Sequence, residues 1–226
     1  MQKDTHSLNT RHLTVDDILR SVSGQKPSLT GGNVTLTCAT LALSVISMAT
    51  ELSIHKTRDK AIRQFLIDKL SDMHKISQAF LLAGEQDQVI FDELREFKGK
   101  KQRSFTNPFY YHSYLKTVTS PIEALSTFLK AASTVSEVVP YCKKAFMSDI
   151  GAGSCLLASA FNALVLITEG NIKAMPKDKS GQYEALKQEI HSQAEQLFLK
   201  INAEVHDRMT APPRKLPFPP PATASA

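Results

Sequence analysis

Residues 27–50, PSLTGGNVTLTCATLALSVISMAT, contain no charged side chain, and residues 150–168, IGAGSCLLASAFNALVLIT, contain none either. Each stretch approaches the roughly 20 apolar residues that a membrane-spanning helix requires. Both, however, are rich in serine, threonine or glycine, and they lack the flanking aromatic residues that are common at membrane interfaces. Small residues in an uncharged helix also suit the centre of a helical bundle. We therefore predict two buried bundle helices and no membrane partner.

Helical spacing of apolar residues continues through most of the remaining sequence, and no strand-like alternation of useful length occurs. The predicted helices cover residues 15–22, 33–55, 58–94, 120–139, 148–168 and 183–205. We expect a bend or break near Gly84, a further break at Gly170–Asn171, and Pro121 in the first turn of its helix. The basic run from Lys98 to Arg103 is expected to be a flexible connection.

The predicted fold class is all-α, an up-and-down bundle of about six long helices with two buried small-residue central helices. The expected domain organisation is a flexible leader over residues 1–12 and one helical domain over residues 13–209. A proline-rich disordered tail is expected over residues 210–226.

The charge balance favours an anionic partner only weakly. The 226 residues include 27 Lys and Arg against 22 Asp and Glu, a formal net charge of +5. That excess is small for the length, so a run such as Lys98 to Arg103 is expected to be solvated, and we predict no nucleic-acid partner.

The cysteines and the N-terminal sequence predict a cytoplasmic protein. Residues 1–20 lack the continuous apolar run of a signal peptide. The cysteines form no CxxC pair, so they are expected to be reduced thiols without a disulfide framework or structural metal. They are Cys38, Cys142 and Cys155.

Common catalytic signatures are absent from the sequence. Residues 151–156, GAGSCL, begin like a GxGxxG motif but lack the last glycine and a preceding strand, which argues against a dinucleotide site. The same residues are not a GxSxG elbow, because Cys155 stands at the position of the last glycine. His191 and Glu195 lie one helical turn apart, a spacing that is more typical of a surface pair than of a metal site.

Two predicted helix starts remain as candidate sites. The first is Gly31-Gly32-Asn33, where paired glycines let a ligand approach the backbone and the helix N-terminus favours a carboxylate or phosphate. The second is Ser148-Asp149, followed by Gly151. Taken alone, Asn33 and Asp149 are more typical of ordinary helix caps. Both starts become stronger candidates if they converge at one rim of the bundle.

These stretches resemble the cyclodeaminase/cyclohydrolase family of folate enzymes. The family's Pro-Gly-Gly-Gly-Ser-Val loop is matched by residues 29–34, LTGGNV, and its Met-Val-x-Asn-Leu-Thr-x-Gly-Lys segment by residues 48–56, MATELSIHK. Its later Asp is matched loosely by Asp87, and its Val-Pro-Leu by residues 120–122. Its Ser-Asp-x-Gly-x-Ala helix is matched by residues 148–153, SDIGAG. The co-linear blocks cover residues 13–205.

The resemblance implies a reaction at the one-carbon bridge of tetrahydrofolate. A cyclohydrolase converts 5,10-methenyltetrahydrofolate to 10-formyltetrahydrofolate, and a cyclodeaminase expels ammonia from 5-formiminotetrahydrofolate. Both need a group that moves protons beside a cationic carbon, for which Asp149 is the candidate. The other implied substrate-binding residues are Gly31, Gly32, Asn33, Lys56, Ser148, Gly151 and Asp87, with Lys98 as a further cation for glutamate carboxylates.

The resemblance also implies a homodimer that acts on a folate, which can be polyglutamylated, without a metal or redox cofactor. Besides Asn33, which replaces the loop serine, four positions depart from the family pattern. Thr30 and Glu51 replace a glycine and an asparagine, and Leu166 and Gly170 stand where the family has asparagines. These departures leave open an alternative, a non-catalytic folate-binding bundle or scaffold with the same fold.

Overall fold

The computed structural model describes residues 12–23 and 28–210. Five helices of 25 to 37 residues form the bundle. In chain order the helices are α1 (Val15–Ser23), α2 (Gly31–His55), α3 (Lys60–Glu96), α4 (Gly99–Gln102), α5 (Pro108–Val138), α6 (Met147–Lys173) and α7 (Lys177–Thr210), with 3-10 turns at Val139–Tyr141 and Lys144–Phe146. The predicted leader and tail lie almost wholly outside the described residues, whereas the all-α bundle is confirmed.

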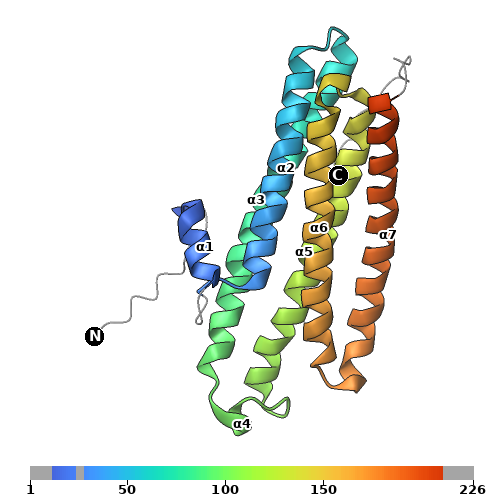
Figure 1. The fold of residues 1–226 in the computed structure, drawn as a ribbon. Helices are drawn as coiled ribbons and strands as arrows, with labels where there is room; N and C mark the ends of the chain where they lie inside the picture. Colours follow the sequence, from blue (N-terminus) through green and yellow to red (C-terminus); the bar gives the residue numbers. More distant parts are fainter. Residues whose placement is uncertain (1–11, 24–27, 211–226) are drawn as a thin grey trace.

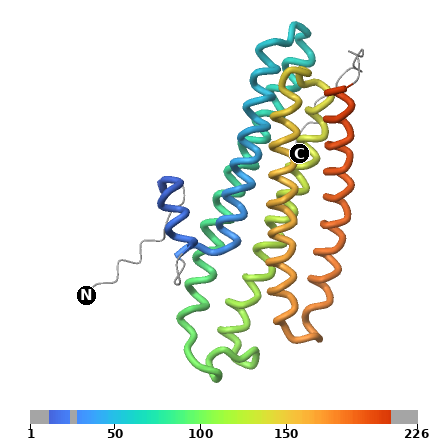
Figure 2. Tube along the Cα trace, in the orientation of Figure 1, coloured from blue at the N-terminus to red at the C-terminus, as the bar shows by residue number. Residues whose placement is uncertain are grey.

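The long helices run alternately up and down, as the tube in Figure 2 shows. Helix α2 packs against α3 and α6, α5 packs against α3, α6 and α7, and α6 packs against α7. The short helix α1 lies beside the start of α2, outside the bundle, and buries none of its residues (Figure 1).

The two uncharged stretches form α2 and α6, which are neighbours in the bundle. Small residues allow their close approach: Ala39, Ala42 and Ala49 are fully buried. A Cβ atom on Gly153 would lie 2.9 Å from the carbonyl oxygen of Ala42, so glycine is required there. Both helices are long and apolar enough to cross a membrane by length and composition alone. Within the protein, 56% of the most apolar window of α2 and 44% of that of α6 are buried. The prediction of buried central helices therefore holds for one face of each helix.

Two predicted breaks do not occur. Helix α3 continues through Gly84, and α6 continues through Gly170 and Asn171 to Lys173. Gly84 instead contacts α2, because its carbonyl accepts a hydrogen bond from Nδ2 of Asn33 at 2.8 Å. Helix α5 begins at Pro108 rather than Ser120, after Asn107 caps it by accepting a hydrogen bond from the Phe109 amide at 3.1 Å.

Pro121 consequently lies inside α5 instead of in its first turn. Proline has no amide hydrogen, so the Thr117 carbonyl loses its usual partner within the helix. Asn171 replaces that partner, since its Nδ2 donates to the Thr117 oxygen at 2.8 Å. The Tyr114 hydroxyl also donates to the Asn171 carbonyl at 2.9 Å. The residue expected to end α6 therefore joins α6 to the proline-containing turn of α5.

The aromatic core joins the helices at mid-height. The rings of Phe80 and Phe128 lie 4.5 Å apart, and those of Phe128 and Phe161 lie 5.7 Å apart. The apolar stripe predicted between residues 183 and 205 packs inward from α7, where Ile190, Ala194 and Ile201 are buried. This stripe is therefore part of the subunit core.

Candidate functional site

The start of α2 lies directly against a carboxylate of α3. A Cβ atom on Gly32 would stand 2.5 Å from Oδ2 of Asp87, so the missing side chain leaves the room that this carboxylate occupies. The Thr30 hydroxyl donates a hydrogen bond to the same oxygen and accepts one from the Asn33 amide at 3.0 Å. Thr30, and not Asn33, is therefore the N-cap of α2. The resulting arrangement is a carboxyl group held at a helix N-terminus, where negative charge is stabilised.

The pKa of Asp87 reflects two opposing effects. Burial raises the pKa above its ordinary value, whereas the hydrogen bonds from the Thr30 side chain and the Asn33 backbone lower it, and burial is the largest effect. A half-buried carboxyl group whose pKa is shifted toward neutrality is suited to taking up and returning a proton.

Asn33 lies beside this carboxylate with part of its hydrogen-bonding capacity unused. The side chain is fully buried, and its Nδ2 donates to the Gly84 carbonyl at 2.8 Å. Its Oδ1 has no hydrogen-bond partner among the described residues. Buried polar atoms are usually paired, so this oxygen offers an acceptor for a donor that the chain does not supply.

Gln88 and Gly84 also position the site, although the sequence analysis did not assign them to it. The Thr30 amide donates to Oε1 of Gln88 at 3.0 Å, which fixes the residue that caps α2. Gly84 could have been found as an isolated glycine within a helical pattern. Gln88 carries no comparable sequence signal, because glutamine is common on any helix surface.

Ser148 and Asp149 lie in the first turn of α6, at the other end of the bundle. Phe146 is the N-cap of α6 and makes no side-chain capping bond, so Asp149 is not the cap that the sequence also allowed. Asp149 is partly exposed, and its charge is favourable in the first helical turn. The Lys56 ammonium lies 4.7 Å from the centre of the Phe146 ring, so the end of α2 meets this turn.

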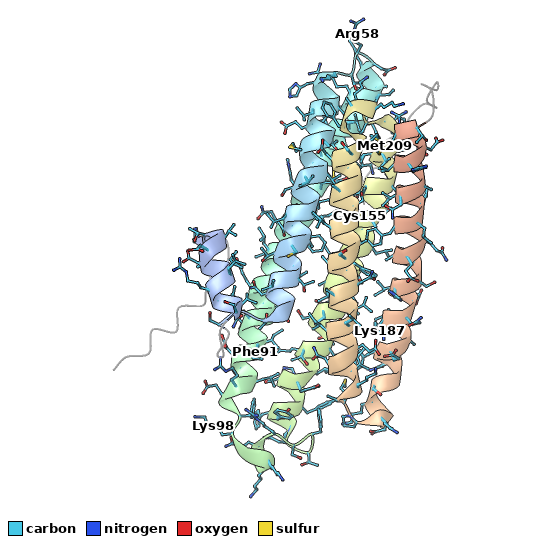
Figure 3. All side chains as sticks on the ribbon, viewed as in Figure 1. Arg58, Phe91, Lys98, Cys155, Lys187 and Met209 are labelled. Carbon is cyan, nitrogen blue, oxygen red and sulfur yellow. The ribbon has the colours of Figure 1, made fainter. Side chains whose placement is uncertain are left out.

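The two predicted helix starts therefore do not converge. Helices α2 and α6 are antiparallel, with Ile167 beside Gly31 and Gly153 beside Ile46. At 1.5 Å per residue, Asp149 is about 27 Å from the level of Gly31 along the bundle, and Lys56 about 37 Å. In Figure 3, Arg58 marks one end of the bundle and Lys98 the opposite end.

The predicted site residues accordingly form two groups. Gly31, Gly32, Asn33 and Asp87 come together at one end, and Lys98 follows α3 at that same end. Lys56, Ser148, Asp149 and Gly151 form the second group at the other end. Gly151 packs inward there, because a Cβ atom on it would lie 3.1 Å from Val205.

The four departures from the family pattern have different surroundings. Thr30 belongs to the Asp87 site, and exposed Glu51 lines an open groove of about 560 Å³ between α2 and α3, together with His74 and Lys75. Leu166 is 69% exposed, and a Cβ atom on Gly170 would meet nothing within 4 Å. Glu51 therefore lies away from Asp87, whereas Leu166 and Gly170 lie at the same end of the bundle as Gly31, because Ile167 is beside Gly31.

The remaining polar clusters are structural. Nearly buried Lys187 lies 2.7 Å from Glu184 and 3.7 Å from Glu169, which ties α7 to the end of α6. His191 stacks on Phe161 and lies 3.5 Å from Glu195. Within residues 12–23 and 28–210, no group of three or more His, Cys, Asp or Glu residues is arranged to hold a metal ion.

Comparisons with known proteins agree with the architecture. Residues 14–195 match the family model described as formiminotransferase-cyclodeaminase. The solved structure of a formiminotetrahydrofolate cyclodeaminase from Thermotoga maritima is similar, with a TM-score of 0.78 and 13% sequence identity over 87% of this chain and 97% of that chain. At this identity the similarity shows the fold alone. No curated protein sequence matches significantly.

Proposed function

Because the chain belongs to the formiminotransferase-cyclodeaminase family, we propose that it is an enzyme acting on the one-carbon group of a tetrahydrofolate at the start of α2. The observation that carries this proposal is the Asp87 carboxyl, which is held by Thr30 against the bare backbone of Gly32. That position combines a proton-transferring group with the exposed backbone of Gly31, which a flat heterocycle can approach.

The surroundings of Asp87 suit a pterin ring. Gly31 is exposed and begins α2, so the first turn offers backbone N–H groups that no helical carbonyl uses. Lys98 lies at the same end and can meet the glutamate carboxylates, whereas Lys56 of the same subunit is at the far end.

Deamination is the reaction that this carboxyl suits best. N10 of 5-formiminotetrahydrofolate bonds to the formimino carbon, and the bond from that carbon to the imino nitrogen breaks. Starting from the protonated formimino group, ammonia and the methenyl cation are formed as one further proton passes from N10 to the departing nitrogen. Asp87 can accept and return this proton, because burial brings its pKa closer to neutrality.

Hydrolysis uses the same group in another order. A water oxygen bonds to the carbon of 5,10-methenyltetrahydrofolate, the bond to N5 breaks, and 10-formyltetrahydrofolate and a proton are released. Asp87 would receive the proton from water. Neither reaction needs a metal or a redox cofactor, and we propose none. The unpaired cysteines support a cytoplasmic location.

The experiment follows ammonia release from 5-formiminotetrahydrofolate and the absorbance of the methenyl compound. Asp87→Asn should remove turnover of whichever substrate reacts. The matched control is Asp68→Asn, because Asp68 is an exposed carboxylate elsewhere on the same helix, where it accepts from Gln64 at 2.9 Å. No turnover of either substrate by the wild type would refute the proposed enzymatic activity.

The alternative is a non-catalytic folate binder or scaffold. The observation that favours it is the exposed side chain of Leu166. A large apolar side chain that is 69% exposed at a position where the family carries an asparagine is suited to a protein contact. Calorimetry with a tetrahydrofolate polyglutamate separates the two functions. Binding without turnover supports the binder, and absence of both supports the scaffold.

We also propose that the protein is a homodimer, because α2 and α6 expose a continuous uncharged surface, here called the apolar face. Its residues are Val34, Cys38, Leu41, Val45, Met48 and Leu52 of α2 and Ala152, Leu156, Ser159, Ala163 and Leu166 of α6. Leu41 and Leu156 are 61% and 55% exposed. An apolar surface of this extent on adjacent helices is typical of an interface.

A further inference from the structure

A groove between α5 and α7 is open to solvent outside the apolar face. Two cavities of about 440 and 460 Å³ follow one another along this groove, and Lys200 of α7 lines both of them. We propose that the groove binds residues 211–226 of the same chain, APPRKLPFPPPATASA, here called the proline-rich segment. This segment lies outside the described residues. The inference goes beyond the proposed function and requires neither the proposed reaction nor the homodimer.

The groove starts at the end of α7 from which the proline-rich segment continues. Asp207, which lines the first cavity, lies one turn before Thr210, the last residue of α7. Met209 marks this end of the helix in Figure 3. From Asp207 to Gln193, which lines the second cavity, α7 rises by about 21 Å. An extended proline-rich chain of sixteen residues spans about 50 Å, so the segment is long enough to follow the whole groove.

The charges at the start of the groove are complementary to those of the segment. Glu204 and Asp207 line the first cavity, whereas the segment carries Arg214 and Lys215 and no acidic side chain. We place the segment antiparallel to α7, with Arg214 level with Asp207. Each residue of an extended proline-rich chain covers about two residues of a helix, so Lys215 is then level with position 205 and close to Glu204. One register therefore pairs both cations with carboxylates.

The same register places the apolar side chains of the segment over apolar parts of the groove. Leu216 is then level with Ala203 of the first cavity. Phe218 comes level with position 199, between the two cavities, where it can pack toward Leu197 of α7 and Leu129 of α5. Leu216 and Phe218 are the large apolar residues of the segment other than proline. Removal of both side chains from water supplies the hydrophobic stabilisation of the contact.

The polar side chains of the groove match a proline-rich backbone. Six of the sixteen residues are prolines, which have a carbonyl acceptor and no amide hydrogen. An extended chain of this kind makes no internal hydrogen bonds, so its carbonyls need donors from outside. The Gln196 amide and the Lys200 ammonium line the second cavity and can supply them. A helix from a second copy would use its carbonyls internally, which favours the proline-rich segment as the occupant.

Attachment to α7 makes a modest contact sufficient. A short connection keeps the segment near the groove at an effective concentration of the order of millimolar. Two ion pairs and two apolar contacts can therefore hold the segment in place, whereas the same residues on another molecule would have to bind from dilute solution. The bound segment covers the groove and joins α5 to the last turns of α7.

Disulfide formation within one chain tests the contact. The exposed Cys38 and Cys155 are first replaced by serine. The test variant then carries Ala203→Cys and Leu216→Cys, and its matched control carries Asn202→Cys and Leu216→Cys. Asn202 is exposed at the same level of α7 but lines neither cavity.

Under mild oxidation, the test variant should form the disulfide within one chain about tenfold faster than the control, because docking holds the two thiols within disulfide reach. Electrophoresis without reductant and mass analysis of the linked peptides measure the product. Equal rates in the two variants would overturn the proposal. A disulfide that joins two chains also overturns it, since the groove then binds the segment of another copy.

Charge reversal tests the register of the segment. In the disulfide test variant, Glu204→Lys with Asp207→Lys should slow disulfide formation about tenfold, because both cations of the segment then face like charges. Adding Arg214→Glu with Lys215→Glu should restore most of the rate. Circular dichroism should show unchanged helix content in each variant.

The control for these variants is Glu189→Lys with Glu195→Lys, which makes the same change of charge on α7 at exposed positions that line neither cavity. It should form the disulfide at the rate of the test variant without charge reversal. A rate that is the same in all charge variants, or that the reversals at Arg214 and Lys215 do not restore, would overturn the pairing of these two cations with the groove.

Discussion

The backbone of Gly32 and the carboxylate of Asp87 occupy one tightly shared space, because a Cβ atom on residue 32 would stand 2.5 Å from Oδ2 of residue 87. The atoms that such a side chain would displace are the movable end of the Asp87 side chain, and no backbone atom is among the nearest. The contact therefore controls where the carboxyl group lies more than whether the chain folds.

Gly32→Ala is accordingly expected to separate activity from stability. Asp87 should rotate away and lose its bond with Thr30, so turnover should fall at least as far as in Asp87→Asn. The free energy of unfolding should change by less than about 1.5 kcal/mol, since a flexible side chain can yield. Thermal unfolding and the ammonia assay measure the two effects, and a fully active Gly32→Ala protein would contradict the proposed role of Asp87.

Gly153→Ala should have the opposite balance. A Cβ atom there would lie 2.6 Å from Ile46 Cγ1 and 2.9 Å from the Ala42 carbonyl oxygen, so α2 and α6 must move apart. Overpacking of this kind typically costs about 1–3 kcal/mol. Chemical denaturation should show that loss, whereas Gly181→Ala, at a site where nothing lies within 4 Å of a new Cβ atom, should not be destabilised. Equal stability of the two variants would refute the close packing of α2 on α6.

The pKa of Asp87 predicts a pH dependence of stability. Burial raises this pKa in the folded protein above the ordinary value of 3.8, so the protonated carboxyl favours folding. The stabilising contribution is fully present below pH 3.8 and is lost as pH rises through the higher folded pKa. The difference in unfolding free energy between wild type and Asp87→Asn should therefore change over this range, in favour of the variant at higher pH. Denaturant titrations from pH 3.5 to pH 7 measure the difference, and a constant difference would contradict the shift.

The bond between Asn171 and Thr117 predicts a coupled pair of substitutions. Asn171→Ala leaves the Thr117 carbonyl without the donor that compensates for Pro121, at a cost of about 1–3 kcal/mol. Pro121→Ala restores an amide hydrogen within α5, so the same loss of Asn171 should cost less in that background. A double-mutant cycle measures this coupling by chemical denaturation. Independent effects of the two substitutions would show that Asn171 does not satisfy this carbonyl.

The fold was predictable because the helical spacing of apolar residues and the two uncharged stretches indicate which residues are buried. The errors at Gly84, Pro121 and Asn171 share one physical cause: each local break signal is offset by a contact with another helix, which a local pattern does not contain. Asp87 entered the prediction only through the family resemblance, since one more acidic residue on a charged helix is not distinctive.

The expected convergence of the two helix starts failed for a topological reason. The start of α6 comes after three long helices, α2, α3 and α5, and each of them crosses the bundle. The number of crossings decides whether two helix starts share an end, and here it places Gly31 and Asp149 at opposite ends. The sequence blocks indicate which residues to consider, but whether these residues meet depends on this number of crossings.

Charge placed on the apolar face should dissociate the dimer while leaving the subunit folded. Leu41 is 61% exposed in the subunit, so Leu41→Glu loses little packing there. In the proposed homodimer Leu41 lies near the middle of the apolar face, so the glutamates of the two subunits would be buried in one interface. Because like charges at an interface cost several kcal/mol, the dissociation constant should rise by about 100-fold or more. Sedimentation measures this change, and circular dichroism should show unchanged helix content.

The control is Leu199→Glu, at a 70% exposed leucine on α7, which should remain dimeric. A Leu41→Glu protein that remains dimeric would contradict an interface on the apolar face.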